Sequence, residues 1–316
     1  MIDPWAAIRE VIRSDWARPV SEAVWAVNEA LKTRHKETVG AVLFYGSSLR
    51  TGLDEGVLDL YLMVNSYTDF YRGHSLAAWA NRLLPPNVFY FELPRNGRTL
   101  RTKYAVISFE DFTSGAGRSA ILPAIWARFS QPTVLLYARD TAARAKMESA
   151  LADAVTTMAL HTAPLTIEPV DALGFWTAGY GRSYQAEARV EGSGRARQLV
   201  EPLSRYEALL RPALDAAGVT YSETGEGRVE IRMSEIERQR GRSFWARASA
   251  ASRLHSIPRL AKAGFTFEGG VDYALWKVER HSGVRVEASA WQRRHPLLSA
   301  LPLVWRAYRQ GAFRRV

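Results

Sequence analysis

The sequence contains no cysteine, which excludes disulfide bonds, thiolate zinc sites and cysteine nucleophiles. Any bound metal must therefore be held by oxygen or imidazole ligands. The chain also lacks an apolar run of the ~18 residues needed to span a bilayer, and its first residues lack the features of a secretory signal. These absences predict a protein that is soluble or peripheral to a membrane, and a reducing cytoplasm fits them.

Acidic residues are scarcer than basic ones. There are 32 Asp and Glu against 42 Lys and Arg, which gives a net charge of +10 and a pI near 9.9. This surplus predicts an anionic partner, either nucleic acid, anionic lipid or a phosphorylated small molecule. A chain of 316 residues is long enough for two domains. We place an α+β domain at 1–162, a mainly helical domain at 163–287 and a basic amphipathic segment at 288–316.

The first half of the chain alternates helical and strand patterns. Apolar residues recur at helical spacing over residues 4–33 and 68–84, and again with an interruption over residues 109–129. We expect residues 47–56 to be a polar loop. Short apolar runs predict five strands, over residues 39–45, 57–64, 88–91, 101–108 and 133–137. The fold class is α+β, with a mixed sheet and flanking helices.

Asp140 is expected to cap a helix that runs towards Leu160. Beyond Pro164, the sequence shows few patterns typical of strands. Residues 169–189 and 195–217 have helical spacing, and Gly218 is placed to end the second of these helices. Residues 219–233 carry short alternating segments that predict a small hairpin. The second domain is therefore expected to be mainly helical.

Gly46 and Ser47 directly follow the first predicted strand. A glycine there lets the backbone approach a phosphate, and the serine hydroxyl and loop N–H groups can donate to its oxygens. Asp59 lies in the next strand, where a carboxylate is unfavourable unless it meets a cation. Magnesium takes such a ligand together with substrate phosphates. The pattern indicates magnesium-dependent nucleotidyl transfer, and the alternative is a simple turn followed by a strand-edge charge.

This arrangement resembles the nucleotidyltransferase superfamily, in which Gly-Ser after an apolar strand precedes an Asp-apolar-Asp/Glu motif. The second carboxylate is absent, because Tyr61 follows Asp59 and Leu60. The departure matters, since two carboxylates on one strand normally share two magnesium ions. One branch of the superfamily has a pattern that tolerates it, the mitochondrial translocator maintenance type of phosphatidate cytidylyltransferase.

The resemblance to that branch covers residues 38–212. Its Tyr-Gly-Ser and Leu-Asp-apolar motifs resemble Tyr45-Gly46-Ser47 and Leu58-Asp59-Leu60, and its Lys-Tyr-Gly-Val-Ile-Ser segment is similar to Lys103–Ser108. A Gly-Arg-Leu-x-Lys-Pro-Val segment resembles residues 127–132, which keep Arg128 and lose the second basic residue. A Ser-Tyr-x-x-Asp-apolar-Arg motif is similar to the region of Tyr184, Glu187 and Arg189.

The resemblance implies that CTP and phosphatidate give CDP-diacylglycerol and pyrophosphate, with Mg2+, on the inner face of the cell membrane. It also implies a following domain of winged-helix type. We assign catalysis to Asp59, Lys103 and Glu187, with Asp59 as the metal ligand. Nucleotide binding is assigned to Tyr45, Gly46, Ser47, Ser48, Arg101, Arg128 and Arg189. The alternative for Lys103 is a solvated strand charge, and for Glu187 and Arg189 an ordinary pair on a helix surface.

No acidic residue occurs from Ala288 to Val316, where arginines alternate with aromatic and aliphatic residues. Such a segment suits an interfacial helix on anionic lipid. Membrane contact is assigned to Trp291, Arg293, Arg294, Trp305, Arg306 and Arg309. The alternative is a C-terminal helix that docks on the protein and exposes its basic face.

Two other functions fit the same features. A nucleotidyltransferase acting on RNA would use the positive charge for phosphate contacts. The sequence shows no recognisable RNA-binding module, so nucleic acid is the less favoured partner. A non-catalytic membrane-binding protein with a degenerate transferase fold would explain Tyr61 in place of a carboxylate.

Overall fold

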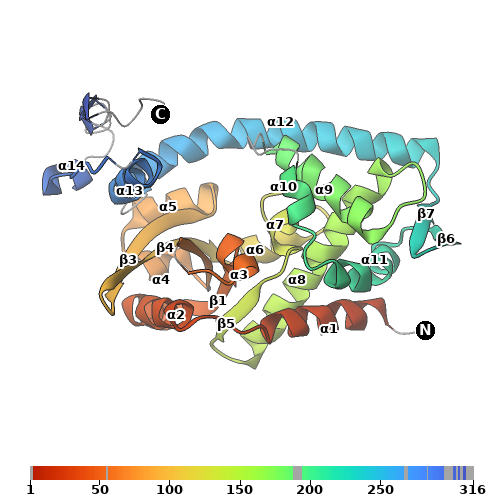
Figure 1. Cartoon of the computed structure of the whole chain (residues 1–316), viewed down its shortest axis with the longest axis horizontal. Helices are drawn as coiled ribbons and strands as arrows, with labels where there is room; N and C mark the ends of the chain where they lie inside the picture. Colours follow the sequence, from red (N-terminus) through yellow and green to blue (C-terminus); the bar gives the residue numbers. More distant parts are fainter. Residues whose placement is uncertain are drawn as a thin grey trace.

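Five apolar segments form one mixed sheet, shown at the left of Figure 1. The strands are β1 (Val39–Tyr45), β2 (Val57–Val64), β3 (Asn87–Arg95), β4 (Arg98–Ser108) and β5 (Val134–Ala138). Their order is β3-β4-β2-β1-β5, with β2 and β4 parallel and the other neighbours antiparallel. The structure is a computed structural model that describes residues 3–54, 56–187, 194–266, 270–282, 284–294, 302–303, 305–306 and 309–310.

Both faces of this sheet are covered by helices, which is why the central strands are near-continuous apolar runs. One face packs against α2 (Glu22–His35), α4 (Tyr67–Tyr71) and α5 (Ser75–Leu83), and it carries Phe44 and Leu60. The other face packs against α1 (Pro4–Trp16), α6 (Phe109–Ala116), α7 (Trp126–Phe129) and α8 (Thr141–Thr162). Side chains alternate between the faces, so Asp59, Tyr61 and Met63 share the second face.

The helical region beyond the sheet is built around α8. The region comprises α9 (Ala172–Ala186), α10 (Gly194–Gln198), α11 (Leu203–Ala217) and α12 (Glu235–Thr266). A short 3-10 turn, Ala163–Leu165, follows α8, and another, Lys36–Thr38, follows α2. A small hairpin, β6 (Tyr221–Gly225) and β7 (Arg228–Ile231), is attached to it. α13 (Gly270–Ser282) and α14 (Ala290–Arg294) follow. In Figure 1, α12 runs along the top from the helical region towards the sheet.

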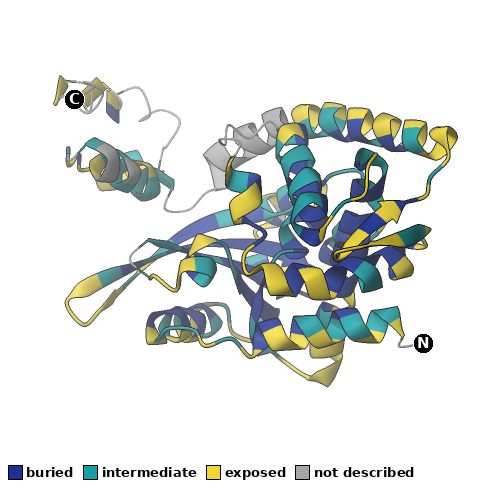
Figure 2. Ribbon diagram, turned by 45° about the vertical axis from the view of Figure 1, so that its right-hand side comes forward, coloured by how far each residue is buried: buried dark blue, intermediate teal, exposed yellow. Residues whose placement is uncertain are grey.

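α8 is buried around most of its circumference, as expected for a helix at the centre of a core. Figure 2 shows this interior as largely buried, whereas the tip of the β3–β4 hairpin and the outer face of α12 are exposed. One hydrophobic cluster joins residues of α1, β1, α8, α11 and α12. The core therefore continues across residue 162, and the domain boundaries placed there and at residue 287 stay predictions.

Several sequence-based expectations are confirmed. The ranges of β1 and β2 agree with the predicted strands, and the Asp140 side chain accepts from the Ala143 N–H at 2.7 Å as an N-cap. Gly218 ends α11 with a φ of 72°, the left-handed conformation that favours glycine. The α+β class is therefore confirmed, with a five-stranded mixed sheet, flanking helices and a helical region.

Other expectations were wrong in detail. Residues 47–56 do not form a loop throughout, because Ser47–Thr51 is a short helix, α3. The helix predicted over residues 68–84 is divided at Arg72, whose φ of 46° cannot continue a right-handed helix. The helix predicted over residues 195–217 is divided over residues 199–202, and Pro202 is the N-cap residue of the second part, α11.

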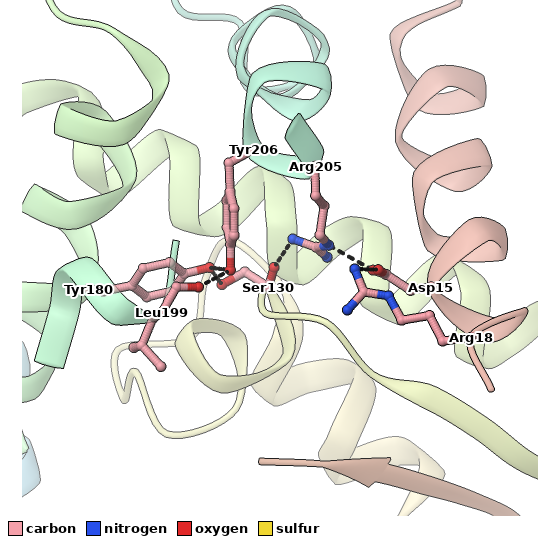
Figure 3. A network of polar contacts seen from close by, with 7 residues as sticks. All are labelled: Asp15, Arg18, Ser130, Tyr180, Leu199, Arg205 and Tyr206. Carbon is pink, nitrogen blue, oxygen red and sulfur yellow. Dashed lines mark hydrogen bonds and ion pairs between the residues drawn. The ribbon is translucent and has the colours of Figure 1, made fainter. Parts of the chain in front are cut away.

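A buried ion pair connects the first helix to the helical region (Figure 3). Arg205 of α11 donates from Nε to Asp15 Oδ2 of α1 at 2.7 Å and from Nη1 to the Ser130 carbonyl at 3.0 Å. Arg18 also pairs with Asp15, at 3.0 Å. The Arg205 and Asp15 side chains are only 4% and 5% exposed, so removing one partner leaves a buried charge with less compensation.

We predict that Arg205→Ala lowers the free energy of unfolding by about 3–5 kcal/mol, because Asp15 stays buried with less compensation. The matched control is Arg13→Ala, which removes a side chain that is 55% exposed and paired with Glu148 at 2.8 Å. That change should cost about 1 kcal/mol or less. Urea unfolding measures both. Equal costs for the two variants would contradict the importance given to the buried pair.

Candidate active site

The chain turns sharply between β1 and α3 at Gly46. Its φ of 93° is a conformation that favours glycine, and a Cβ added there would lie 2.9 Å from Asp59 Oδ2. The glycine backbone is thus in direct proximity to the carboxylate. Ser47 begins α3, and the buried Ser48 donates its hydroxyl to the Val57 carbonyl at 3.3 Å. Ser48 therefore ties α3 to β2, and its role in nucleotide binding stays a prediction.

Asp59 lies in the middle of the sheet. It is aligned with Tyr45 of β1 on one side and with Lys103 of β4 on the other. Its side chain retains some exposure to solvent, although protein surrounds it on most sides. The strand register alone therefore brings together a tyrosine, a carboxylate and a lysine that are far apart in the sequence.

The carboxyl group of Asp59 experiences two opposing effects. Burial raises its pKa, and the positive charges of Lys103, Arg128 and Arg50 lower it. Burial has the larger effect, so the net pKa is raised above the ordinary value for aspartate. Three cationic side chains thus converge on one partly solvated carboxylate, and such a group is suited to binding a polyanion.

Tyr61 occupies the position at which the superfamily pattern has its second carboxylate. Its hydroxyl accepts a hydrogen bond from Arg128 Nη1 at 3.1 Å. The ring is 2% exposed and packs edge-on against Tyr45 and Phe129. The tyrosine is therefore a rigid support that orients Arg128, which also lies 5.8 Å from the Tyr45 ring.

Glu187 caps the C-terminus of α9, and its negative charge acts on Arg128. Burial disfavours the charged form of Arg128, but the neighbouring Tyr61, Tyr45 and Glu187 outweigh this, and the pKa of Arg128 is raised. Glu187 is thus brought towards the site through Arg128. Its predicted partner Arg189 lies outside the described residues.

Arg101 lies at the outer end of the same sheet face. Its Nε is 3.4 Å from Glu92 Oε1, and its guanidinium carbon is 5.5 Å from the ring of Trp276. Tyr90 donates to the same Glu92 oxygen at 2.7 Å. Arg101 is therefore half-buried at the margin of the site and already engaged with a carboxylate and an aromatic ring.

The site could hold a magnesium ion in one way only, with a single carboxylate from the protein. Within the residues that the structure describes, no three His, Asp or Glu side chains form a group that could hold a metal by themselves. Magnesium often binds through one or two carboxylates together with substrate phosphates. Asp59 satisfies that mode, with the substrate supplying the remaining ligands, whereas two metals shared between two carboxylates of β2 do not fit.

The sequence-predicted residues Tyr45, Gly46, Asp59, Lys103 and Arg128 therefore lie together. Sequence reasoning missed Arg50, although its position one helical turn after Gly46 was a usable signal. It also missed Tyr273 of α13, whose pKa is raised by burial and then by the charge of Asp59. No local pattern links Tyr273 to the site.

A separate cavity lies on the opposite face of the sheet. It has a volume of about 50 Å³ and is lined by residues such as Val24, Phe44, Ser48 and Leu58. Phe44 and Leu58 belong to the cluster beneath α2, away from the face that carries Asp59. This cavity contains none of the converging cations, so we do not assign the chemistry to it.

The proposed membrane residues are partly described. Trp291 and Trp305 are 56% and 62% exposed, and Arg309 is also exposed. Arg293 Nε pairs with Asp272 of α13 at 2.9 Å, and Arg306 Nη1 donates to the Glu287 carbonyl at 3.0 Å. Arg294 ends α14, but its side chain lies outside the described residues.

None of the described helices has the length and apolar character needed to cross a bilayer. The search for known families found no family model that matches this sequence, and no curated protein matches it either. A functional interpretation therefore rests on the geometry of the site and on the sequence motifs.

The raised pKa of Asp59 predicts a pH-dependent stability difference. A carboxyl whose pKa is higher in the folded state favours folding at low pH, and this contribution is lost as pH rises through the folded pKa. Asp59→Asn should therefore raise the free energy of unfolding at pH 7 relative to wild type. The gain should shrink as pH falls towards about 4, where the unfolded carboxyl also becomes protonated.

Asp54→Asn is the matched control with the opposite sign. The hydrogen bonds from Arg98, at 2.9 and 3.0 Å, lower the pKa of Asp54. This variant should be less stable than wild type at pH 7, with the difference fading below about pH 4. Urea unfolding at a series of pH values measures both, and the same sign for both variants would contradict the description of Asp59.

Proposed function

We propose that this chain is a magnesium-dependent nucleotidyltransferase that makes CDP-diacylglycerol and pyrophosphate from CTP and phosphatidate. One observation carries the proposal: Asp59 lies against the Gly46 turn while Lys103, Arg128 and Arg50 converge on it. A single carboxylate surrounded by cations suits a reaction in which negative charge is redistributed over phosphate groups. The choice of CTP and phosphatidate comes from the resemblance in motifs. The same resemblance leads us to propose that the helical region is of winged-helix type.

The reaction is an in-line displacement at the α-phosphorus of CTP. A phosphate oxygen of phosphatidate forms the new P–O bond, the bond to the bridging α–β oxygen breaks, and pyrophosphate leaves with the electron pair. A phosphate monoester is already a nucleophile at neutral pH, so no strong general base is required. Positioning and charge stabilisation therefore account for most of the catalysis.

Each side chain has a role that follows from its position. Lys103 and Arg128 would stabilise the negative charge that moves towards the leaving pyrophosphate. The Ser47 hydroxyl and the backbone at Gly46 would contact the outer phosphates. Asp59 would hold magnesium on the triphosphate, and the ion would supply further positive charge. Glu187 would position Arg128 and, through it, the phosphates.

The C-terminal segment supports a lipid acceptor. Trp291 and Trp305 are exposed, and exposed tryptophan beside arginine is favoured at the level of lipid headgroups. Arg309 is exposed as well, and residues 288–316 contain no acidic side chain. Within this segment, an anionic surface would therefore meet aromatic and cationic groups and no acidic side chain. We propose that the protein is peripheral on the inner face of the cell membrane.

The activity is tested with purified protein, CTP, magnesium and vesicles that contain phosphatidate, by detecting CDP-diacylglycerol. We expect Asp59→Asn and Lys103→Met to lower the rate on the order of 10²-fold or more, because each removes charge stabilisation from the transition state. Lys146→Met, at an exposed position of α8, is the control and should retain the wild-type rate. Absence of lipid product, or transfer of CMP to RNA instead, would contradict the proposal.

Membrane contact is tested separately by flotation with anionic vesicles. Replacing both Trp291 and Trp305 by Ala should reduce the floated fraction, because two interfacial aromatic anchors are lost. Trp25→Ala, at an exposed position of α2, is the matched control. High salt should weaken binding of the wild type, since part of the attraction is electrostatic. Undiminished flotation of the double variant would indicate that the segment docks on the protein instead.

A further inference from the structure

α13 covers the part of the Asp59 face that the helices of the main core leave open. It contacts β3, and the Tyr273 ring lies 5.4 Å from the ring of Tyr90. Tyr90 is aligned with Lys103, and Lys103 is aligned with Asp59. Tyr273 therefore packs on Tyr90, at one end of a row of aligned residues that continues through Lys103 to Asp59. The effect of the Asp59 charge on the pKa of Tyr273 agrees with this placement.

Trp276 follows Tyr273 by three residues, so both side chains lie on one face of α13. Their rings are 6.0 Å apart, with an interplanar angle of 31°. The Arg101 guanidinium carbon lies 5.5 Å from the Trp276 ring. Both aromatic side chains remain partly exposed. The two rings are thus partly accessible to solvent, and they lie beside Arg101 at the margin of the candidate site.

We infer that Tyr273 and Trp276 form the aromatic wall on which the base of a bound nucleoside triphosphate stacks, while Lys103 and Arg128 hold its phosphates. The inference rests on the proposed nucleotidyl transfer and names the residues that would bind the base. Two observations support it: Tyr273 packs against Tyr90, which is aligned with Lys103, and a planar cation, Arg101, already lies against Trp276. A planar base would use the same surface.

If the base stacks on these rings, the effect of the rings on affinity should depend on whether the ligand has a base. Every base has a π-face, so the aromatic wall should strengthen the binding of any nucleoside triphosphate and contribute nothing to a ligand without a base. Inorganic tripolyphosphate is such a ligand, and it would meet only the cations around Asp59. Comparison of CTP with tripolyphosphate therefore separates base stacking from phosphate binding and from a general loss of structure.

The experiment measures the dissociation constants of CTP and tripolyphosphate, each with magnesium, by calorimetry on the full chain. Trp276→Leu should weaken CTP binding by about 5- to 150-fold and leave tripolyphosphate binding unchanged. Trp276→Phe keeps an aromatic face and should restore most of the CTP affinity. Trp25→Leu, at an exposed position of α2, is the matched control and should bind both ligands as the wild type does.

The outcomes distinguish this inference from the proposed function. If Lys103→Met weakens both ligands but Trp276→Leu and Tyr273→Leu bind CTP as tightly as wild type, the aromatic wall is refuted and the proposed function stands. If Trp276→Leu weakens both ligands equally, the pair only anchors α13, and the inference is also refuted. If the wild type binds neither ligand, the proposed function fails together with the inference.

Discussion

The carboxylate of Asp59 is the constraint on which the rest of the site depends. Its position in the middle of the sheet removes much of its hydration, and this disfavours its charged form. The surrounding Lys103, Arg128 and Arg50 offset part of that effect without abolishing it. The carboxylate therefore gains from any added cation, and the cations gain from any added anion. The proposed metal–triphosphate complex would bring both charges to the site.

Tyr61 changes how the charge of that complex would be balanced. A second carboxylate on β2 would add negative charge and recruit a second metal ion. The tyrosine instead accepts from Arg128 and fixes the guanidinium beside Asp59. In the proposed reaction, the protein cations would take over part of the charge stabilisation that two metals would provide. The absence of the acid is thus compatible with catalysis, because an arginine is held close to the position where the acid would act.

Local sequence patterns predicted much of this arrangement, and tertiary packing decided the rest. β1, β2 and the cap at Asp140 follow from apolar periodicity and hydrogen-bonding side chains close in sequence. The proximity of Asp59 to Lys103 depends on a parallel pairing of β2 with β4, which no local pattern specifies. Tyr273 reaches the site only because α12 spans the molecule and returns the chain to the sheet, as Figure 1 shows.

The buried network of Figure 3 connects the helical region to this chemistry. Arg205 donates to the carbonyl of Ser130, the residue that ends α7, and α7 carries Arg128. The Ser130 hydroxyl is also within 3.1 Å of the Tyr180 hydroxyl on α9, the helix that Glu187 ends. The same contacts therefore fix the end of the short helix that carries Arg128 and connect it to the helix that ends at Glu187. A guanidinium held in this way needs little reorganisation when charge develops beside it, and that is the condition under which fixed charges are most effective in catalysis.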